Sequence, residues 1–449
     1  FGPFDRVLNA DILFASIPSF SICILSYYSF PIVDPKVYDD KFIQAAKQIL
    51  HIGFYSDNWY LPLYPYLLSI FFKFFGINTF YPILFNAFFH GLTSFLLAKI
   101  AKNFNTKWFY PTLILASCLP HLIWRTTYVY AETLFILLLV SSLFFLFVYL
   151  DKKKLIYLIL SSFFLGLSFI TKASNILVAF ILPFFLFFLF YKKISHNYIS
   201  SLKLVFLYSF IFIFILSFQF QRIHKETGYY GYSYQTGGRL LYYMYPCLLS
   251  KFGCGKKNQI AADKARALDD PIKRDIEYSK IMNPYYLNIQ EKEIAIKLIK
   301  EIDLLTIISS SVGGYIKLFF HNFTYEVFDR LHLSSIHLSE FSGGLFTKIK
   351  LMLQKIFQEA NFMFFWLISE LFLFLSRIIQ TIGLFYFFSI KKKVYEFILL
   401  LVFFVPSLIP IISLGSIRYR VPVEPLLIIL TISGLSFIYN YCKNKRIKN

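Results

Sequence analysis

Residues 176–190 read ILVAFILPFFLFFLF, without one charged side chain. A second run, YEFILLLVFFVPSLIPIISLG at 395–415, has a single charged residue, Glu396. A bilayer core about 30 Å thick is crossed by roughly 20 apolar helical residues at about 1.5 Å each. Runs that reach or approach this length lie at 8–30, 80–100, 109–123, 129–150, 155–171, 174–191, 203–220, 360–389, 395–414 and 422–441. The sequence therefore predicts an all-α polytopic membrane protein with at least ten spans.

Two further segments bear on the number of spans. Residues 304–320 and 346–358 are apolar enough either to cross the membrane or to lie along its interface. With them the expected architecture is a bundle of about 10–13 transmembrane helices, with interfacial helices and an extracytoplasmic region.

The composition excludes two other classes of protein. Of 449 residues, 57% are hydrophobic and 16% are charged, against about 25% charged in an ordinary soluble domain. A disordered chain lacks this apolar content, and a soluble multidomain enzyme could not hide it from water. The net charge of +20 raises the question of a nucleic-acid partner, which the positions of the basic residues answer.

Most of the clustered Lys and Arg residues fall in short loops separated by pairs of spans. The clusters are Lys102 and Lys107, Lys152–Lys154, Lys192, Lys193 and Lys203, Lys391–Lys393, and the C-terminal CKNKRIKN. This is the positive-inside pattern, which predicts that the clusters face the cytoplasm. No basic stripe lies on a soluble module, so a nucleic-acid partner is not expected.

The opposite face then carries two long segments, at 31–79 and 221–359. We expect an N-terminal transmembrane module over 1–220 that includes the first outer loop. An extracytoplasmic loop with interfacial helices follows over 221–359, and the C-terminal transmembrane helices occupy 360–449. The functional part of the molecule is expected on this outer face.

The first outer segment contains adjacent carboxylates before a helical pattern. Asp39 and Asp40 precede KFIQAAKQIL, whose apolar residues share one helix face: Phe42, Ile43, Ala46, Ile49 and Leu50. The two carboxylates either cap this helix or include a general base whose pKa is tuned at the membrane surface. The next stretch predicts an interfacial helix opened by Pro62 and closed by Gly76.

Isolated cations lie at the predicted outer ends of spans: Arg125, Lys172, Arg418 and Arg420. Each alone is explained by snorkelling to lipid headgroups. Four at the same depth also suit an anionic ligand such as a lipid-linked phosphate. Glu132 lies inside an apolar run, where an ionisable residue is either functional or structurally paired with Arg125 or a tyrosine.

The sequence lacks the common nucleotide and metal motifs. It contains no Walker A loop, no Gly-rich dinucleotide fingerprint, no HExxH and no His cluster with metal-ligand spacing. His51, His90 and His121 are expected to be packed or interfacial. Cys247 and Cys254 would pair if their segment faces an oxidising compartment, whereas the other three cysteines are expected to pack as small apolar side chains.

Several stretches, in this order and topology, resemble the GT-C superfamily of membrane glycosyltransferases. They are the acidic first loop before KFIQAAKQILHIGFY, then LPLYPYLLSIFFKFFG, LPHLIWRTTYVYAETLFILLLV, GLSFITKASNILVAFILP and RYRVPVEPLLIIL. The resemblance is to bacterial relatives of dolichyl-phosphate-mannose protein mannosyltransferases and of the lipid A aminoarabinose transferase.

This resemblance implies inverting transfer of a sugar from a polyprenyl-phosphate donor. In the family an acidic residue of the first outer loop is taken as the base, and Asp39 and Asp40 match it best. Asp34 is a third candidate, because it stands four residues before Tyr38 in a chain that has Phe42 where relatives have Tyr.

The resemblance also implies a phosphate site. Its basic residues map to Lys172, Arg418 and Arg420, and the stretch YQTGGRLLYYMY would bring Arg239, with Gly237 and Gly238, near the site. Adjacent Asp39 and Asp40 are able to hold a divalent cation, although the chemistry does not require one.

The resulting hypothesis is a glycosyltransferase of the bacterial cytoplasmic membrane with its site on the outer face. A lipid, glycan or protein would supply the acceptor hydroxyl. A transporter or lipid flippase is the alternative, although the sequence shows no paired halves. A third reading is a noncatalytic membrane subunit.

Overall fold

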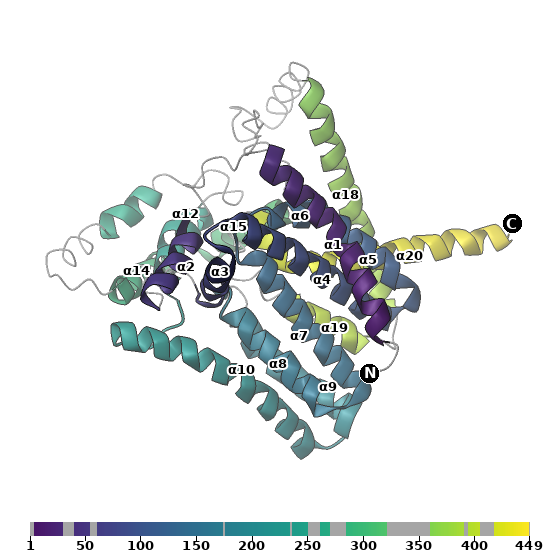
Figure 1. Cartoon of the computed structure of the whole chain (residues 1–449), viewed down its shortest axis with the longest axis horizontal. Helices are drawn as coiled ribbons and strands as arrows, with labels where there is room; N and C mark the ends of the chain where they lie inside the picture. The colour runs from purple at the N-terminus through teal and green to yellow at the C-terminus, as the bar shows by residue number, and fades with distance from the viewer. Residues whose placement is uncertain are drawn as a thin grey trace. The chain divides into compact units, whose positions relative to one another are not determined.

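The computed structural model describes residues 4–29, 40–53, 61–173, 176–233, 236–249, 261–269, 284–320, 360–389, 394–404 and 417–448. Throughout these ranges the regular structure is helical and contains no strand (Figure 1). The expected all-α class is therefore confirmed.

Five helices in these ranges are long and apolar enough to cross a membrane. They are Phe80–Phe104, Glu132–Lys152, Leu177–Ser195, Tyr198–Thr227 and Arg420–Lys445. Shorter apolar helices accompany them: Asp11–Leu25, Leu63–Phe75, Leu155–Phe169, Leu304–Ile316 and Leu371–Phe387. These helices support an integral membrane protein. The total of ten to thirteen spans stays a prediction.

The chain divides into two compact units. The first comprises Phe1–Tyr234, Gly383–Pro410 and Val421–Asn449, and the second comprises Gln235–Ile382 and Ile411–Arg420. The long helix α18 (Ala360–Ser389) contributes residues to both units. The two units are described separately below, and the sequence-based division at 220 and 359 stays a prediction.

The first unit is a helix bundle whose neighbours pack in chain order. Helix α1 (Phe4–Ser29) packs on α4 (Phe80–Phe104), α4 on α7 (Glu132–Lys152), α7 on α8 (Leu155–Phe169), and α8 on α10 (Tyr198–Thr227) (Figure 1). Gly91 of α4 allows a close approach to α1, because a β-carbon there would collide with Ser16.

Small hydroxyl side chains join the middle of this bundle. The Ser142 hydroxyl donates to the carbonyl oxygen of Ser161 at 2.7 Å, and the hydroxyls of Ser161 and Tyr208 lie 3.2 Å apart. In an apolar environment such interhelical hydrogen bonds fix the rotation of each helix about its axis. They therefore set the face that each helix presents to the bundle.

Helices α2 (Asp40–Ile52) and α3 (Leu63–Phe75) follow the sequence prediction closely. Helix α3 is preceded by Pro62 and ends at Gly76, whose φ of 78° is accessible to glycine. The predicted apolar face of α2 is confirmed: Phe42, Ile43, Ala46 and Ile49 are buried and Leu50 is partly buried. The Phe42 ring meets the Tyr64 ring of α3 edge-on, with centroids 5.2 Å apart.

The expected single run at 109–123 is instead two helices. Helix α5 (Phe109–Cys118) ends before Leu119, whose ψ of 112° is extended, and α6 (Pro120–Thr126) begins at the next residue. Proline lacks an N–H donor and disfavours helical geometry at the residue before it. Pro120 therefore separates the two helices, and α6 carries its own set of side chains.

Residues beside different Lys-rich clusters contact one another. The Lys193 ammonium lies 3.2 Å from a carboxylate oxygen of Glu396 in α19 (Val394–Phe404). The ring of Phe104, which lies between Lys102 and Lys107, is 5.0 Å from the ring of Phe387, which precedes the Lys391–Lys393 cluster. Residues in contact lie at the same end of the bundle, so these contacts agree with the predicted orientation, which itself stays a prediction.

The second unit contains a small apolar cluster between short helices. Helix α11 (Thr236–Arg239), η4 (Leu240–Met244) and α12 (Tyr245–Leu248) precede α14 (Pro284–Lys300) and α15 (Leu304–Phe320). The buried residues of this apolar cluster are Leu241, Tyr245, Ala261, Ala265, Ala295 and Leu298. Cys247 in α12 is disulfide-bonded, whereas Cys23, Cys118 and Cys442 are free.

Candidate functional site

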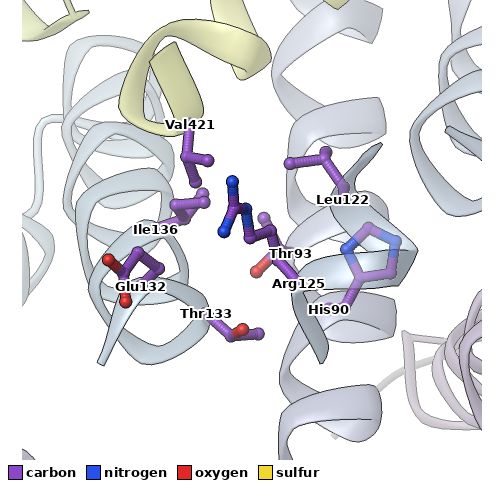
Figure 2. A pocket seen from close by; sticks show the side chains of 8 residues that line it. All are labelled: His90, Thr93, Leu122, Arg125, Glu132, Thr133, Ile136 and Val421. Carbon is purple, nitrogen blue, oxygen red and sulfur yellow. The ribbon is translucent and has the colours of Figure 1, made fainter. Parts of the chain in front are cut away.

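A small pocket with a mostly apolar surface and several ionisable side chains in its lining lies inside the first unit, and its volume of about 10 Å³ is close to the room needed for one water molecule. Helix α4 supplies His90 and Thr93, α6 supplies Leu122 and Arg125, α7 supplies Glu132, Thr133 and Ile136, and Val421 precedes α20 (Glu424–Lys448). Arg125 and Glu132, both singled out in the sequence, therefore line the same pocket (Figure 2).

The turn between α6 and α7 positions these two residues. The Asn86 side-chain amide donates to the carbonyl oxygen of Tyr128 at 2.7 Å, and the Trp124 indole N–H donates to the Tyr128 hydroxyl at 3.2 Å. The Thr126 hydroxyl lies 3.0 Å from the Cys23 sulfur. Contacts from α1 and α4 therefore fix the backbone that carries Arg125 and Glu132.

Arg125 is buried at the end of α6, with 4% of its surface exposed. Figure 2 shows its guanidinium reaching between α4 and α7 toward Val421, while the Glu132 carboxylate points away from it. A buried guanidinium costs several kcal/mol unless it is compensated, so it is unusual for a residue that only snorkels to headgroups.

Glu132 forms an ion pair with Lys172, a partner that the sequence prediction did not consider. Its Oε1 atom lies 3.2 Å from the Lys172 ammonium nitrogen. Glu132 is 1% exposed and is the first residue of α7, where the helix dipole favours a negative charge. Lys172 also lies 5.8 Å from the centroid of the Phe135 ring, one turn further along α7.

The end of α8 places Lys172 beside the two predicted outer segments. The Leu63 backbone N–H, at the start of α3, donates to the carbonyl oxygen of Ile170 at 3.3 Å. The Tyr232 hydroxyl, beyond the end of α10, donates to the carbonyl oxygen of Phe169. Elements predicted on the outer face therefore meet within three residues of Lys172.

A second buried acid–base pair was missed in the sequence. His121 Nδ1 of α6 lies 3.3 Å from a carboxylate oxygen of Glu424, and both side chains are nearly inaccessible. His121 is packed, as expected, but its partner Glu424 was not anticipated. The available signal was Glu424 itself, an ionisable residue within the apolar run 422–441.

The predicted catalytic carboxylates are only partly described. Asp34, Tyr38 and Asp39 lie outside the described residues. Asp40 is the first residue of α2, as expected, and its side chain is not described. No group of three or more His, Cys, Asp or Glu able to hold a metal occurs among the described residues, so a divalent cation at Asp39 and Asp40 stays a prediction.

The later basic residues belong to the second unit, and their convergence with Lys172 stays a prediction. Arg420 is buried and donates to the carbonyl oxygen of Phe319 at 3.3 Å, while the side chain of Arg418 is not described. Arg239 is exposed at the end of α11.

The neighbouring glycines of that segment pack against α14. The Gly237 N–H donates to the Asn288 side-chain oxygen at 2.7 Å, and a β-carbon on Gly237 would collide with the Asn288 backbone. These contacts give Gly237 a packing role. A contribution of Gly237 and Gly238 to a donor site stays a prediction.

Residues 61–218 match the profile of the dolichyl-phosphate-mannose-protein mannosyltransferase family. The match covers about a third of the chain and includes Arg125, Glu132 and Lys172. It confirms the resemblance to GT-C membrane glycosyltransferases and supports glycosyltransferase activity. No curated protein matches the chain.

Proposed function

We propose that this chain, similar over residues 61–218 to a family of membrane mannosyltransferases, is an inverting glycosyltransferase that uses a polyprenyl-phosphate sugar donor. The acceptor is a hydroxyl of a lipid, glycan or protein, and the site faces the outer side of a bacterial cytoplasmic membrane. The observation that carries the proposal is that Glu132, inside the matched range, pairs with Lys172 and lines the same pocket as Arg125.

The basic side chains suit the phosphate of the donor. As the glycosidic C–O bond breaks, its electron pair passes to the phosphate oxygen, and fixed cations stabilise the developing charge. Lys172 lies next to the predicted outer segments and pairs with Glu132, and Arg125 lines the pocket that Glu132 also lines. Arg418 and Arg420 complete the proposed phosphate-binding set, since one guanidinium group can bind two oxygens of a phosphate at once.

A first-loop carboxylate is proposed as the general base. It takes the proton of the acceptor hydroxyl as the acceptor oxygen forms a bond to the anomeric carbon, and attack opposite the leaving phosphate inverts that carbon. The candidates are Asp34, Asp39 and Asp40. The start of α2 is favourable for an ionised Asp40, because helix N-termini stabilise negative charge.

Single Asn substitutions test the base. We expect one of Asp34→Asn, Asp39→Asn and Asp40→Asn to lower transfer from a labelled polyprenyl-phosphate sugar about 10²–10⁴-fold, the range for loss of a general base. Asp151→Asn, at the exposed end of α7, is the matched control and should retain full activity. Full activity in all three first-loop variants would contradict the carboxylate mechanism.

Substitution of Lys172 tests the phosphate site separately. Lys172→Ala should raise the KM for the donor about tenfold or more, because loss of a charge-assisted contact is worth about 1.5–3 kcal/mol. The KM for the acceptor should change little. An unchanged donor KM would remove Lys172 from the proposed phosphate site while leaving the base to be judged by the aspartate variants.

A further inference from the structure

The Lys172 ammonium is held on one side by α7. Glu132 Oε1 lies 3.2 Å from it, and the fully buried Phe135 ring lies 5.8 Å away. Of the two paired side chains, Glu132 is 2% exposed and Lys172 is 16% exposed. The carboxylate is therefore the interior member of the pair, and the ammonium is the member nearer to solvent.

This arrangement restricts a side chain that is normally mobile. Lysine carries its charge on four rotatable bonds, so an unrestrained ammonium samples a wide volume. The backbone of Lys172 is fixed by its N–H bond to the Ser168 carbonyl at 3.1 Å, and its other end is fixed by Glu132. Both ends of the side chain are thus anchored.

We propose that Glu132 is a positioning residue that holds the Lys172 ammonium where it meets the phosphate of the donor. This inference rests on the proposed function. An ammonium group has three N–H donors, so one cation can bind a carboxylate and a phosphate oxygen at the same time. Glu132 does not contact the substrate in this arrangement and acts through Lys172.

Removing the charge of Glu132 tests the inference. In Glu132→Gln the ammonium loses its fixed counter-ion, and we expect the donor KM to rise about tenfold with a smaller change in kcat. Glu396→Gln is the matched control, because Glu396 pairs with Lys193 at the same 3.2 Å. That variant should keep the donor KM of the wild type.

A rescue experiment separates positioning from a general effect on folding. Glu132→Asp shortens the carboxylate arm by one methylene and should raise the donor KM severalfold. Adding Lys172→Arg lengthens the partner and should restore part of the lost affinity. These conservative variants also serve if Glu132→Gln does not fold, and thermal unfolding in detergent should be measured for every variant.

The outcomes distinguish the two proposals. A donor KM that rises in Lys172→Ala and stays normal in folded Glu132→Gln overturns the positioning role and leaves the proposed function intact. A normal donor KM in Lys172→Ala overturns the assignment of Lys172 to the phosphate. A raised KM in Glu132→Asp that the double variant does not improve also counts against positioning through Lys172.

Discussion

The hydroxyl of Tyr232 donates a hydrogen bond to the carbonyl oxygen of Phe169, at the end of α8. A helix leaves its last carbonyl groups without partners inside the helix. Here a residue beyond α10 supplies one partner, and Leu63 at the start of α3 supplies another, to the carbonyl of Ile170. The orientation of Lys172 therefore depends on two segments that are distant in the sequence.

Tyr232→Phe should destabilise the protein and weaken donor binding. The variant leaves the Phe169 carbonyl without its donor, which costs about 1–3 kcal/mol for a buried group. We expect a lower unfolding temperature and a severalfold higher donor KM. Tyr208→Phe is the control: its hydroxyl contacts Ser161, eleven residues before Lys172 or about 16 Å along a helix. It should lower stability with an unchanged donor KM.

The buried hydroxyl of Tyr232 should make the stability of the protein depend on pH. Burial raises the pKa of Tyr232 above the value of about 10 that tyrosine has in an unfolded chain. Its stabilisation is therefore fully present below pH 10 and is lost as the pH rises further, because the unfolded state then releases the proton. The difference in unfolding temperature between wild type and Tyr232→Phe should be constant from pH 7 to about 10 and shrink above it. A constant difference at higher pH would contradict this.

The adjacent glycines of the second unit should differ in their tolerance of alanine. A β-carbon at Gly237 meets the backbone of Asn288, which cannot move aside cheaply, whereas at Gly238 the nearest atom is a carboxylate oxygen of Glu291 at 3.1 Å. Gly237→Ala should therefore lose about 1–3 kcal/mol of stability. Gly238→Ala should be close to neutral, since alanine favours the helix. Thermal unfolding and limited proteolysis of both variants will show whether this order holds.

The disulfide bond of Cys247 determines how many thiols should react with a thiol reagent. It is disulfide-bonded, three of the five cysteines are free, and we expect Cys254 to be the partner. Protein purified without reductant and denatured should react with three maleimides, and with five after reduction. The variants Cys247→Ser and Cys254→Ser should each expose one extra thiol. Five reactive thiols before reduction would contradict both the disulfide and the oxidising outer location of this segment.

The sequence predicted helix ends and buried faces correctly where the residues that determine them lie close together in the chain. Pro62 and Gly76 set both ends of α3, and the spacing of Phe42, Ile43 and Ala46 identified the buried face of α2. Pro120 carried an equally local signal, which the length of the apolar run obscured.

The partners of the ionisable residues could not be predicted in this way. Glu132 was recognised as a candidate because a carboxylate in an apolar run is costly. Its pairing with Lys172, forty positions away, depends on how α7 and α8 pack. The same holds for His121 and Glu424, which come together only when α20 returns to α6.

One amide nitrogen, that of Asn86, donates to the Tyr128 carbonyl at 2.7 Å and to the Tyr64 hydroxyl at 3.5 Å. These hydrogen bonds fix the position of the turn that carries Tyr128 relative to both α3 and α4. An inserted or deleted residue between Thr126 and Glu132 would move the Tyr128 carbonyl off this amide and shift the first residue of α7. The length of this turn therefore sets the spacing between Arg125 and Glu132, and a change of length would disturb the pocket that both residues line.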